Sequence, residues 1–199
     1  MEVTLFPVSA VISIVAILTK RADRLPYLLA LQAVLISACE IYSYDHDLLS
    51  PEAIAYFGAS IANSILPPLL LLKLAKHVDN PPEEAPRIAV AFSSGVAALL
   101  VYLSLLPPFK AKEVMSCALS TITPIFMIAY SLNPVRVITA LNMASNALHP
   151  LLAEGPPFFS AISNLSMLLV NGVAFFLIDQ ARKTYGGSDL AGWDKWLKK

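Results

Sequence analysis

The segment at residues 53–75, AIAYFGASIANSILPPLLLLKLA, decides the class of fold because its only charged residue is Lys73, close to its end. A helix that crosses the hydrocarbon core of a bilayer needs about 20 mostly apolar residues. The segment is long enough, and it lies between an acidic loop and the polar run at residues 76–84. It therefore predicts a membrane-spanning helix.

Six further segments have the same apolar character, and short polar or proline-containing loops separate them. The seven predicted spans are residues 3–19, 27–43, 53–75, 88–106, 114–132, 135–153 and 158–178. No loop between them is long enough to divide the chain into two domains. We therefore expect an all-α, polytopic membrane helix bundle of about seven transmembrane helices over residues 1–185.

The composition of the whole chain agrees with this class. Apolar residues make up 57% of the 199 residues and charged residues 14%, and the mean hydropathy is +0.66. Soluble domains carry roughly 25% charged residues. The formal net charge is zero, so nothing in the electrostatics favours nucleic acid as a partner. The lipid bilayer is the expected surrounding.

The basic residues predict an orientation, because cytoplasmic loops of membrane proteins are enriched in Lys and Arg. With the N-terminus outside, only Lys110 and Lys112 fall outside among the 14 basic residues. An even number of helices would scramble this alternation. The sequence thus predicts a multi-pass protein of the cell membrane with a cytoplasmic C-terminus.

Residues 186–199 predict a short cytoplasmic amphipathic tail. Ser188 can cap a short helix, with Leu190, Trp193 and Trp196 on one face and lysines nearby. This pattern is typical of a helix that lies in the membrane interface. The alternative is a tail that packs on a partner subunit.

A possible internal repeat relates the third and sixth predicted helices at an offset of 82 residues. Residues 62–70 match residues 144–152 at five of nine positions, and the same offset places the first helix on the fourth and the second on the fifth. Three helices per unit would give a 3+3 inverted repeat plus one helix, an arrangement that many transporters use. The matched segment is short and apolar, so chance similarity is the alternative.

The matched segments contain prolines, which remove backbone donors and predict helix breaks. Such breaks at membrane depth require protein or water partners. Polar residues beside the breaks suggest a water-containing path, and interhelical hydrogen-bonded packing is the alternative. The predicted breaks are at Pro67, Pro68, Pro124 and Pro150, and the candidate path residues beside them are Asn63, Ser64, Ser145 and Asn146.

Three more residues complete the ion-path candidates. Glu40 is the only carboxylate within an apolar run, and an ionisable residue in a span is a functional hypothesis. Asn142 and His149 lie on the sixth helix, where capping by His149 is the alternative to a relay. The sequence has no pair of facing histidines for haem, no metal-ligand spacing and no nucleotide or catalytic motif. We expect no cofactor, no metal site and no catalytic residue.

The order of these features resembles the hydrogenase-4 membrane component E family. The resemblance lies in residues 14–36 with their basic break, in Ser60 to Pro68 followed by the loop with Asn80, Pro81 and Pro82, in Asn146 to His149, and in the run from Leu177 to Gly187. It covers nearly the whole chain. It implies a non-catalytic membrane subunit of a membrane-bound [NiFe]-hydrogenase or formate hydrogenlyase related to complex I.

The resemblance implies antiporter-like membrane subunits and hydrogenase or complex I-like subunits as partners. The chain would help to form an arm that translocates protons or sodium ions. The family tends to carry a lysine in its third helix and a glutamate in its sixth, at positions that correspond here to Asn63 and the neighbourhood of Ser145. Both are neutral, which favours a weak or lost ion path. The alternatives are a stand-alone small transporter and a structural or assembly subunit.

Overall fold

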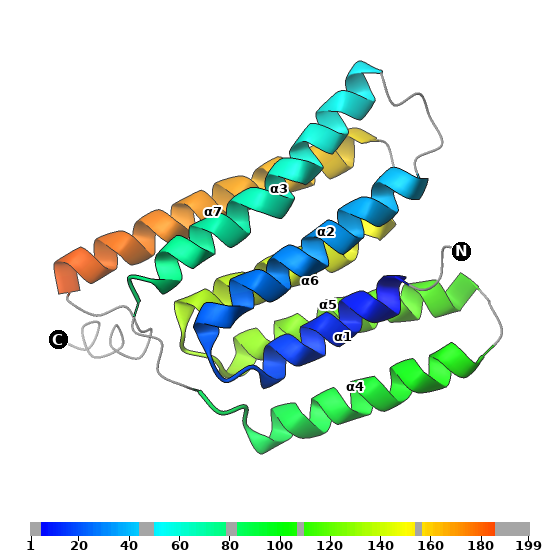
Figure 1. The fold of residues 1–199 in the computed structure, drawn as a ribbon, viewed down its shortest axis with the longest axis horizontal. Helices are drawn as coiled ribbons and strands as arrows, with labels where there is room; N and C mark the ends of the chain where they lie inside the picture. The colour runs from blue at the N-terminus through cyan, green and yellow to red at the C-terminus, as the bar shows by residue number, and fades with distance from the viewer. Residues whose placement is uncertain (1–4, 44–49, 79–82, 107–109, 154–156, 186–199) are drawn as a thin grey trace.

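The structure is a computed structural model that describes the backbone of residues 5–43, 50–78, 83–106, 110–153 and 157–185, and most of their side chains. These residues form seven α-helices and one short 3-10 helix (Figure 1). The helices are α1 (Leu5–Leu18), η1 (Ala22–Arg24), α2 (Leu25–Ser43), α3 (Pro51–Ala75), α4 (Arg87–Leu105), α5 (Lys110–Tyr130), α6 (Pro134–Ala153) and α7 (Pro157–Tyr185).

The helices form two layers with one helix at the edge. One layer contains α1, α2 and α3, and the other contains α5, α6 and α7, so that α1 packs on α5, α2 on α6 and α3 on α7 (Figure 1). Helix α4 packs against α1 and α5 at the side. Small buried residues such as Ser9, Ala16, Ala140 and Ala147 let the helix backbones approach closely, as in membrane bundles.

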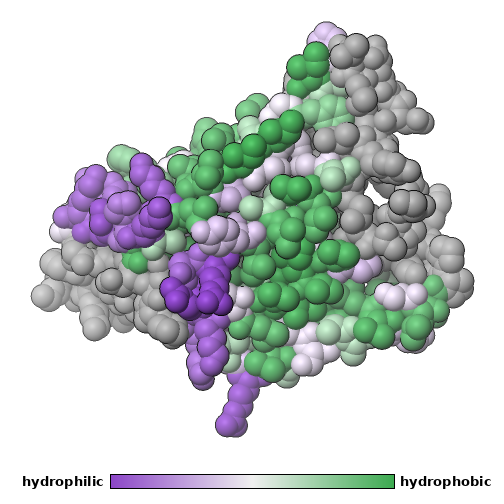
Figure 2. All heavy atoms as spheres, in the orientation of Figure 1, coloured by the Kyte–Doolittle hydropathy of each residue, from purple (hydrophilic) through white to green (hydrophobic). Residues whose placement is uncertain are grey.

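Each of the seven helices has one terminus at the same end of the bundle, which we call the basic end. Helices α1, α3, α5 and α7 finish there, and α2, α4 and α6 start there (Figure 1). Figure 2 shows hydrophilic side chains gathered at this end and apolar ones over the middle of the visible face. The described basic residues of this end are Lys20, Arg21, Arg24, Lys73, Lys76, Arg87, Arg136, Arg182 and Lys183.

Three described helical segments are long and apolar enough to cross a membrane: Phe57–Ala75, Arg87–Leu105 and Ile162–Thr184. Two shorter apolar helices, Pro7–Leu18 and Val114–Tyr130, accompany them. Large apolar side chains such as Leu105, Leu169 and Phe176 point outward and are exposed. The all-helical class is therefore confirmed, and these exposed faces suit an apolar surrounding.

The predicted helix breaks at the prolines are wrong, because the helices that contain them are continuous. Helix α3 runs through Pro67 and Pro68, α5 runs through Pro124, and α6 runs through Pro150. Each proline removes one donor, from the carbonyl four residues earlier, while the rest of the ladder can persist. The prolines thus free single carbonyls within continuous helices.

Helix α7 extends further than the sequence predicts. It ends at Tyr185, beyond the expected limit at residue 178. Asp179 forms ion pairs with Arg182 at 3.4 Å and with Lys183 at 2.6 Å, at helical spacings of three and four residues. Such pairs stabilise a helix outside the apolar segment. The predicted tail at residues 186–199 lies outside the described residues.

Candidate functional site

Three asparagines from three helices meet inside the bundle. Asn63 of α3 donates from Nδ2 to Asn164 Oδ1 of α7 at 2.9 Å and, more weakly, to Asn146 Oδ1 of α6 at 3.4 Å. All three side chains are buried. Asparagine is costly against lipid, so each turns inward toward a partner. We call these residues the asparagine triad.

Serines from α2 and α3 extend the polar region on one side of the triad. Ser37 Oγ lies 2.8 Å from Ser64 Oγ and 3.1 Å from Ser60 Oγ. Ser64 also donates to the Ser60 carbonyl at 2.9 Å, a common arrangement for a hydroxyl in a helix. Hydroxyls can both donate and accept, so these serines can offer either a hydrogen-bond donor or an acceptor to a neighbouring group.

A small cavity lies between the triad and these serines. Its volume is about 10 Å³, and Ser37, Ser60, Ser64 and the three asparagines line it together with Ala33 and Ile36. This is close to the space that one water molecule needs. Asn63 Oδ1 and Asn164 Nδ2 also make no hydrogen bond to any described group. The cavity therefore suits a molecule the size of water that both donates and accepts.

The prolines of α3 add acceptors at the same place. Pro67 and Pro68 have no N–H, so they cannot donate to the carbonyls of Asn63 and Ser64 four residues earlier. Pro150 has the same relation to Asn146 in α6. Three of the residues that line the cavity, Asn63, Ser64 and Asn146, are thus also residues whose carbonyls lose their helical donor.

A second asparagine cluster joins α6 and α7 nearer the basic end. Asn142 Nδ2 donates to Asn171 Oδ1 at 2.7 Å, and Asn171 Nδ2 donates back to Asn142 Oδ1 at 2.8 Å. The remaining N–H groups reach the carbonyls of Ile138 and Met167 within their own helices. We call these two residues the asparagine pair, and its polar atoms are satisfied.

The structure brings together some of the predicted path residues and separates others. Asn63, Ser64 and Asn146 line one cavity, and Asn142 lies in the separate pair. Ser145 is half-buried and does not line the cavity. Glu40 and His149 lie on α2 and α6, but their side chains are outside the described residues.

Arg136 forms a polar cluster that the sequence analysis did not single out. Its side chain is 1% exposed, and its Nε lies 3.0 Å from Glu83 Oε2. Its Nη2 donates at 2.6 Å to the carbonyls of Thr19 and Lys20, at the end of α1. A cation is favourable at a helix C-terminus, where the carbonyls lack helical donors. Arg136 therefore ties the start of α6 to the end of α1 and to Glu83.

Neighbouring contacts reinforce this cluster. Asn133 caps α6 by accepting from the backbone N–H of Val135 at 2.9 Å. Ser131 donates to Glu83 Oε2 at 3.2 Å, and the Glu83 N–H donates to the Lys20 carbonyl at 2.9 Å. We call Arg136, Glu83 and the carbonyls of Thr19 and Lys20 the arginine clamp.

Gln32 is a further buried polar residue that the sequence analysis missed. It is fully buried between α1 and α2, and its Nε2 donates to Ser9 Oγ at 3.0 Å and to Ser13 Oγ at 3.3 Å. The only available signal was its polarity within an apolar helix. The sequence could not show that two serines of α1 face it.

Chemically, the triad region is neutral and can bind water, but an amide or a serine hydroxyl does not release a proton at neutral pH. Fold and site together define an all-helical protein with apolar candidate membrane spans and a small polar interior. No family model matches the chain, and no curated protein or solved structure is significantly similar to it.

Proposed function

We propose that this chain is a non-catalytic integral membrane subunit of a hydrogenase-like or complex I-like complex. In this proposal all seven helices span the cell membrane, with the N-terminus outside and the C-terminus in the cytoplasm. The subunit helps to form a membrane arm that moves protons or sodium ions. Antiporter-like and hydrogenase subunits are its partners.

The observation that carries the proposal is the neutral, hydratable cavity between α2, α3, α6 and α7. Asn63 lines this cavity, and it lies at the position where the hydrogenase-4 component E family, which the chain resembles, tends to carry a lysine. A buried lysine in that place would be a proton site, whereas an amide can only hold and orient water. This favours a supporting role in a larger ion-coupling complex.

The size of the cavity argues against a stand-alone transporter of organic solutes. Such a transporter needs a midplane pocket between its repeats, and pockets for small organic ligands measure roughly 300–1,000 Å³. The cavity at Asn63 and Asn146 measures about 10 Å³. The 3+3 repeat stays a prediction from the sequence: α1 packs on α5 and α2 on α6, but the described helices show no comparable packing of α4 on α2 or of α5 on α3.

The proposal is tested by purifying the tagged chain from its native membranes in a mild detergent. Native gel electrophoresis and mass spectrometry should recover hydrogenase subunits and larger antiporter-like subunits in one complex. A tagged, unrelated membrane protein from the same membranes serves as the control. Recovery of the chain without such subunits overturns the proposal.

The proposed topology has its own test. Single cysteines introduced at Lys112 and at Ser188, in a background without Cys39 and Cys117, should label from opposite sides of the membrane. A membrane-impermeant maleimide added to intact cells should label the Lys112→Cys variant, and the Ser188→Cys variant only after lysis. The reverse pattern contradicts the orientation.

A further inference from the structure

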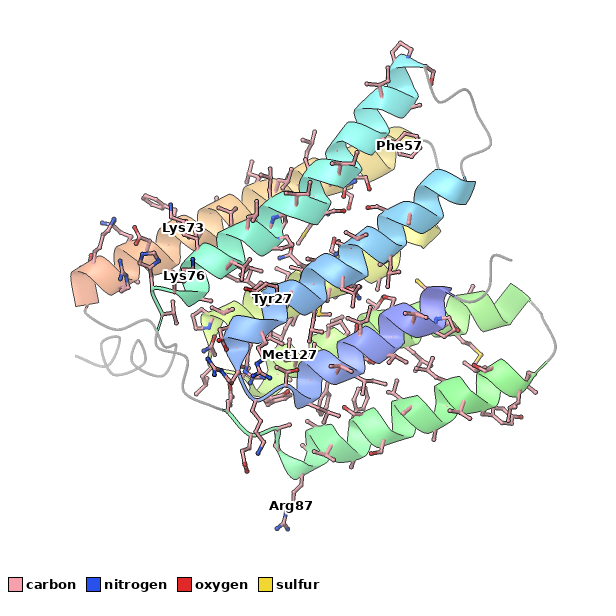
Figure 3. The ribbon with its side chains drawn as sticks, viewed as in Figure 1. Tyr27, Phe57, Lys73, Lys76, Arg87 and Met127 are labelled. Carbon is pink, nitrogen blue, oxygen red and sulfur yellow. The ribbon has the colours of Figure 1, made fainter. Side chains whose placement is uncertain are left out.

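A larger cavity, of about 120 Å³, lies between the last turns of α3 and α7 at the basic end. Leu74, Phe175 and Ile178 supply apolar walls. Lys73, His77, Asp179 and Arg182 supply the polar ones. Figure 3 shows Lys73 near the end of α3, on the side of the last turns of α7. The pocket thus combines apolar and charged walls where two candidate spans end.

The charge of this pocket is positive. Among the described residues that line it, the one carboxylate is that of Asp179, which is paired with Lys183 at 2.6 Å and with Arg182 at 3.4 Å. Lys183 can balance the negative charge of Asp179, so the positive charges of Lys73 and Arg182 remain in excess. Both residues are at least one-third exposed, so their donors can reach a ligand at the mouth of the pocket.

Two contacts hold the polar walls in place. Lys73 Nζ lies 5.9 Å from the centroid of the Phe175 ring, within the range of a cation–π interaction. His77 Nδ1 lies 2.7 Å from the Lys73 carbonyl and donates to it. The lysine ammonium is therefore held above an apolar surface.

We propose that this pocket binds the phosphate group of an anionic phospholipid, with Lys73 and Arg182 as the cationic donors. Basic pockets between transmembrane helices are known sites for such headgroups. A soluble phosphate compound would use only the charged rim. A lipid can also place acyl chains on the exposed apolar sides of the two helices, where Leu69 and Leu177 lie.

The test measures lipid retention by native mass spectrometry of the purified full chain in detergent. The wild type should retain added phosphatidylglycerol or cardiolipin and should retain less phosphatidylcholine. The Lys73→Gln/Arg182→Gln double variant should lose retention several-fold. Lys76→Gln is the matched control, because Lys76 is an exposed lysine of the same end that does not line the pocket.

Three results would overturn the proposal. The first is unchanged lipid retention in the double variant, and the second is equal retention of phosphatidylcholine by the wild type. The third is displacement of the lipid by excess inorganic phosphate, because that result would assign the site to a soluble anion. Circular dichroism and gel filtration check the fold of each variant. If the glutamine variant misfolds, the charge-retaining Lys73→Arg/Arg182→Lys variant decides, since it should keep the lipid and its failure rejects the proposal. The test does not depend on the partners of the chain.

Discussion

The asparagine pair and the asparagine triad share helices α6 and α7, to which the triad adds α3, but they differ in how their polar atoms are satisfied. Asn142 and Asn171 exchange two hydrogen bonds and use their remaining N–H groups within their own helices. In the triad, Asn63 donates twice, while its Oδ1 and the Nδ2 of Asn164 make no hydrogen bond to a described group. A cavity of about 10 Å³ adjoins each cluster, but the one beside Asn171 is otherwise lined by apolar side chains, whereas serines and asparagines line most of the one beside the triad.

This difference indicates a separate role for each cluster, although both consist of the same type of residue. The pair is a closed unit that holds α6 against α7, and interhelical hydrogen bonds of this kind contribute about 0.6 kcal/mol each on average. The triad is open, with acceptors and donors directed at a space that water can fill. Packing is therefore the role of the pair, and hydration is the role that fits the triad.

The largest expected effect comes from the arginine clamp, because it fixes the helix that carries members of both clusters. Replacing Arg136 with Met removes the donors of the Thr19 and Lys20 carbonyls and leaves Glu83 without its cation. Breaking a buried charge pair costs roughly 3–5 kcal/mol. Glu83 is 32% exposed and stays partly hydrated, so we expect about 3 kcal/mol of lost unfolding free energy.

Unfolding in mixed detergent micelles measures this loss. Arg87→Met is the matched control, because Arg87 is exposed at the same end and points away from the bundle (Figure 3). The control should change stability by less than about 0.5 kcal/mol. Equal losses in both variants would show that the clamp does not hold α6.

The next effect tests whether the pair is closed. Asn142→Leu or Asn171→Leu strands the partner amide in the interior, at an expected cost of about 1–2 kcal/mol. The double leucine variant removes both amides and should recover much of that loss. A double-mutant cycle in the same micelles measures the coupling, and additive losses would contradict the reciprocal hydrogen bonds.

A smaller loss is expected in the triad. Asn63→Leu removes two hydrogen bonds, one of them long, and also removes an oxygen that is unsatisfied among the described groups. We expect about 0.6 kcal/mol, less than for Asn142→Leu measured alongside it, because a water molecule in the adjoining cavity can donate to the Asn164 and Asn146 oxygens that lose their donor. A larger loss at Asn63 than at Asn142 would reverse the comparison. In the proposed ion-translocating complex, slowed ion movement in Asn63→Leu would favour hydration of the triad, and unchanged movement would favour a scaffold role.

Much of the fold could be predicted because apolar length is a local property of the chain. The predicted segment 53–75 differs from α3 by two residues at its start, and the third helix ends at Ala75 as expected. The end of α7 could not be predicted from hydropathy, because ion pairs of Asp179 continue the helix past the apolar run. The packing of α1 on α5 depends on contacts between distant segments, which no local pattern encodes.

The candidate site was predictable only in part for the same reason. Polarity in an apolar run indicated Asn63, Ser64 and Asn146, which line one cavity. It equally indicated Ser145, which is half-buried and does not line the cavity. The burial of Arg136 was hidden because an arginine beside a loop ordinarily reaches water, and only the tertiary fold places the end of α1 against it.

The smallest expected effect on stability concerns Glu40, the carboxylate of α2 whose side chain is outside the described residues. Since the triad is neutral, a proton relay through this subunit would need a titratable residue elsewhere, and Glu40 is the sequence's candidate. Glu40→Gln keeps the shape of the side chain but cannot release a proton. If the proposed complex pumps ions through this chain, we expect Glu40→Gln to impair the pumping, with normal recovery of the complex by native electrophoresis. Glu52→Gln, in the first turn of α3, is the control carboxamide change. Normal pumping by Glu40→Gln would reject the relay and would favour a structural role for this chain in the proposed membrane arm, because the neutral amides of the triad release no proton.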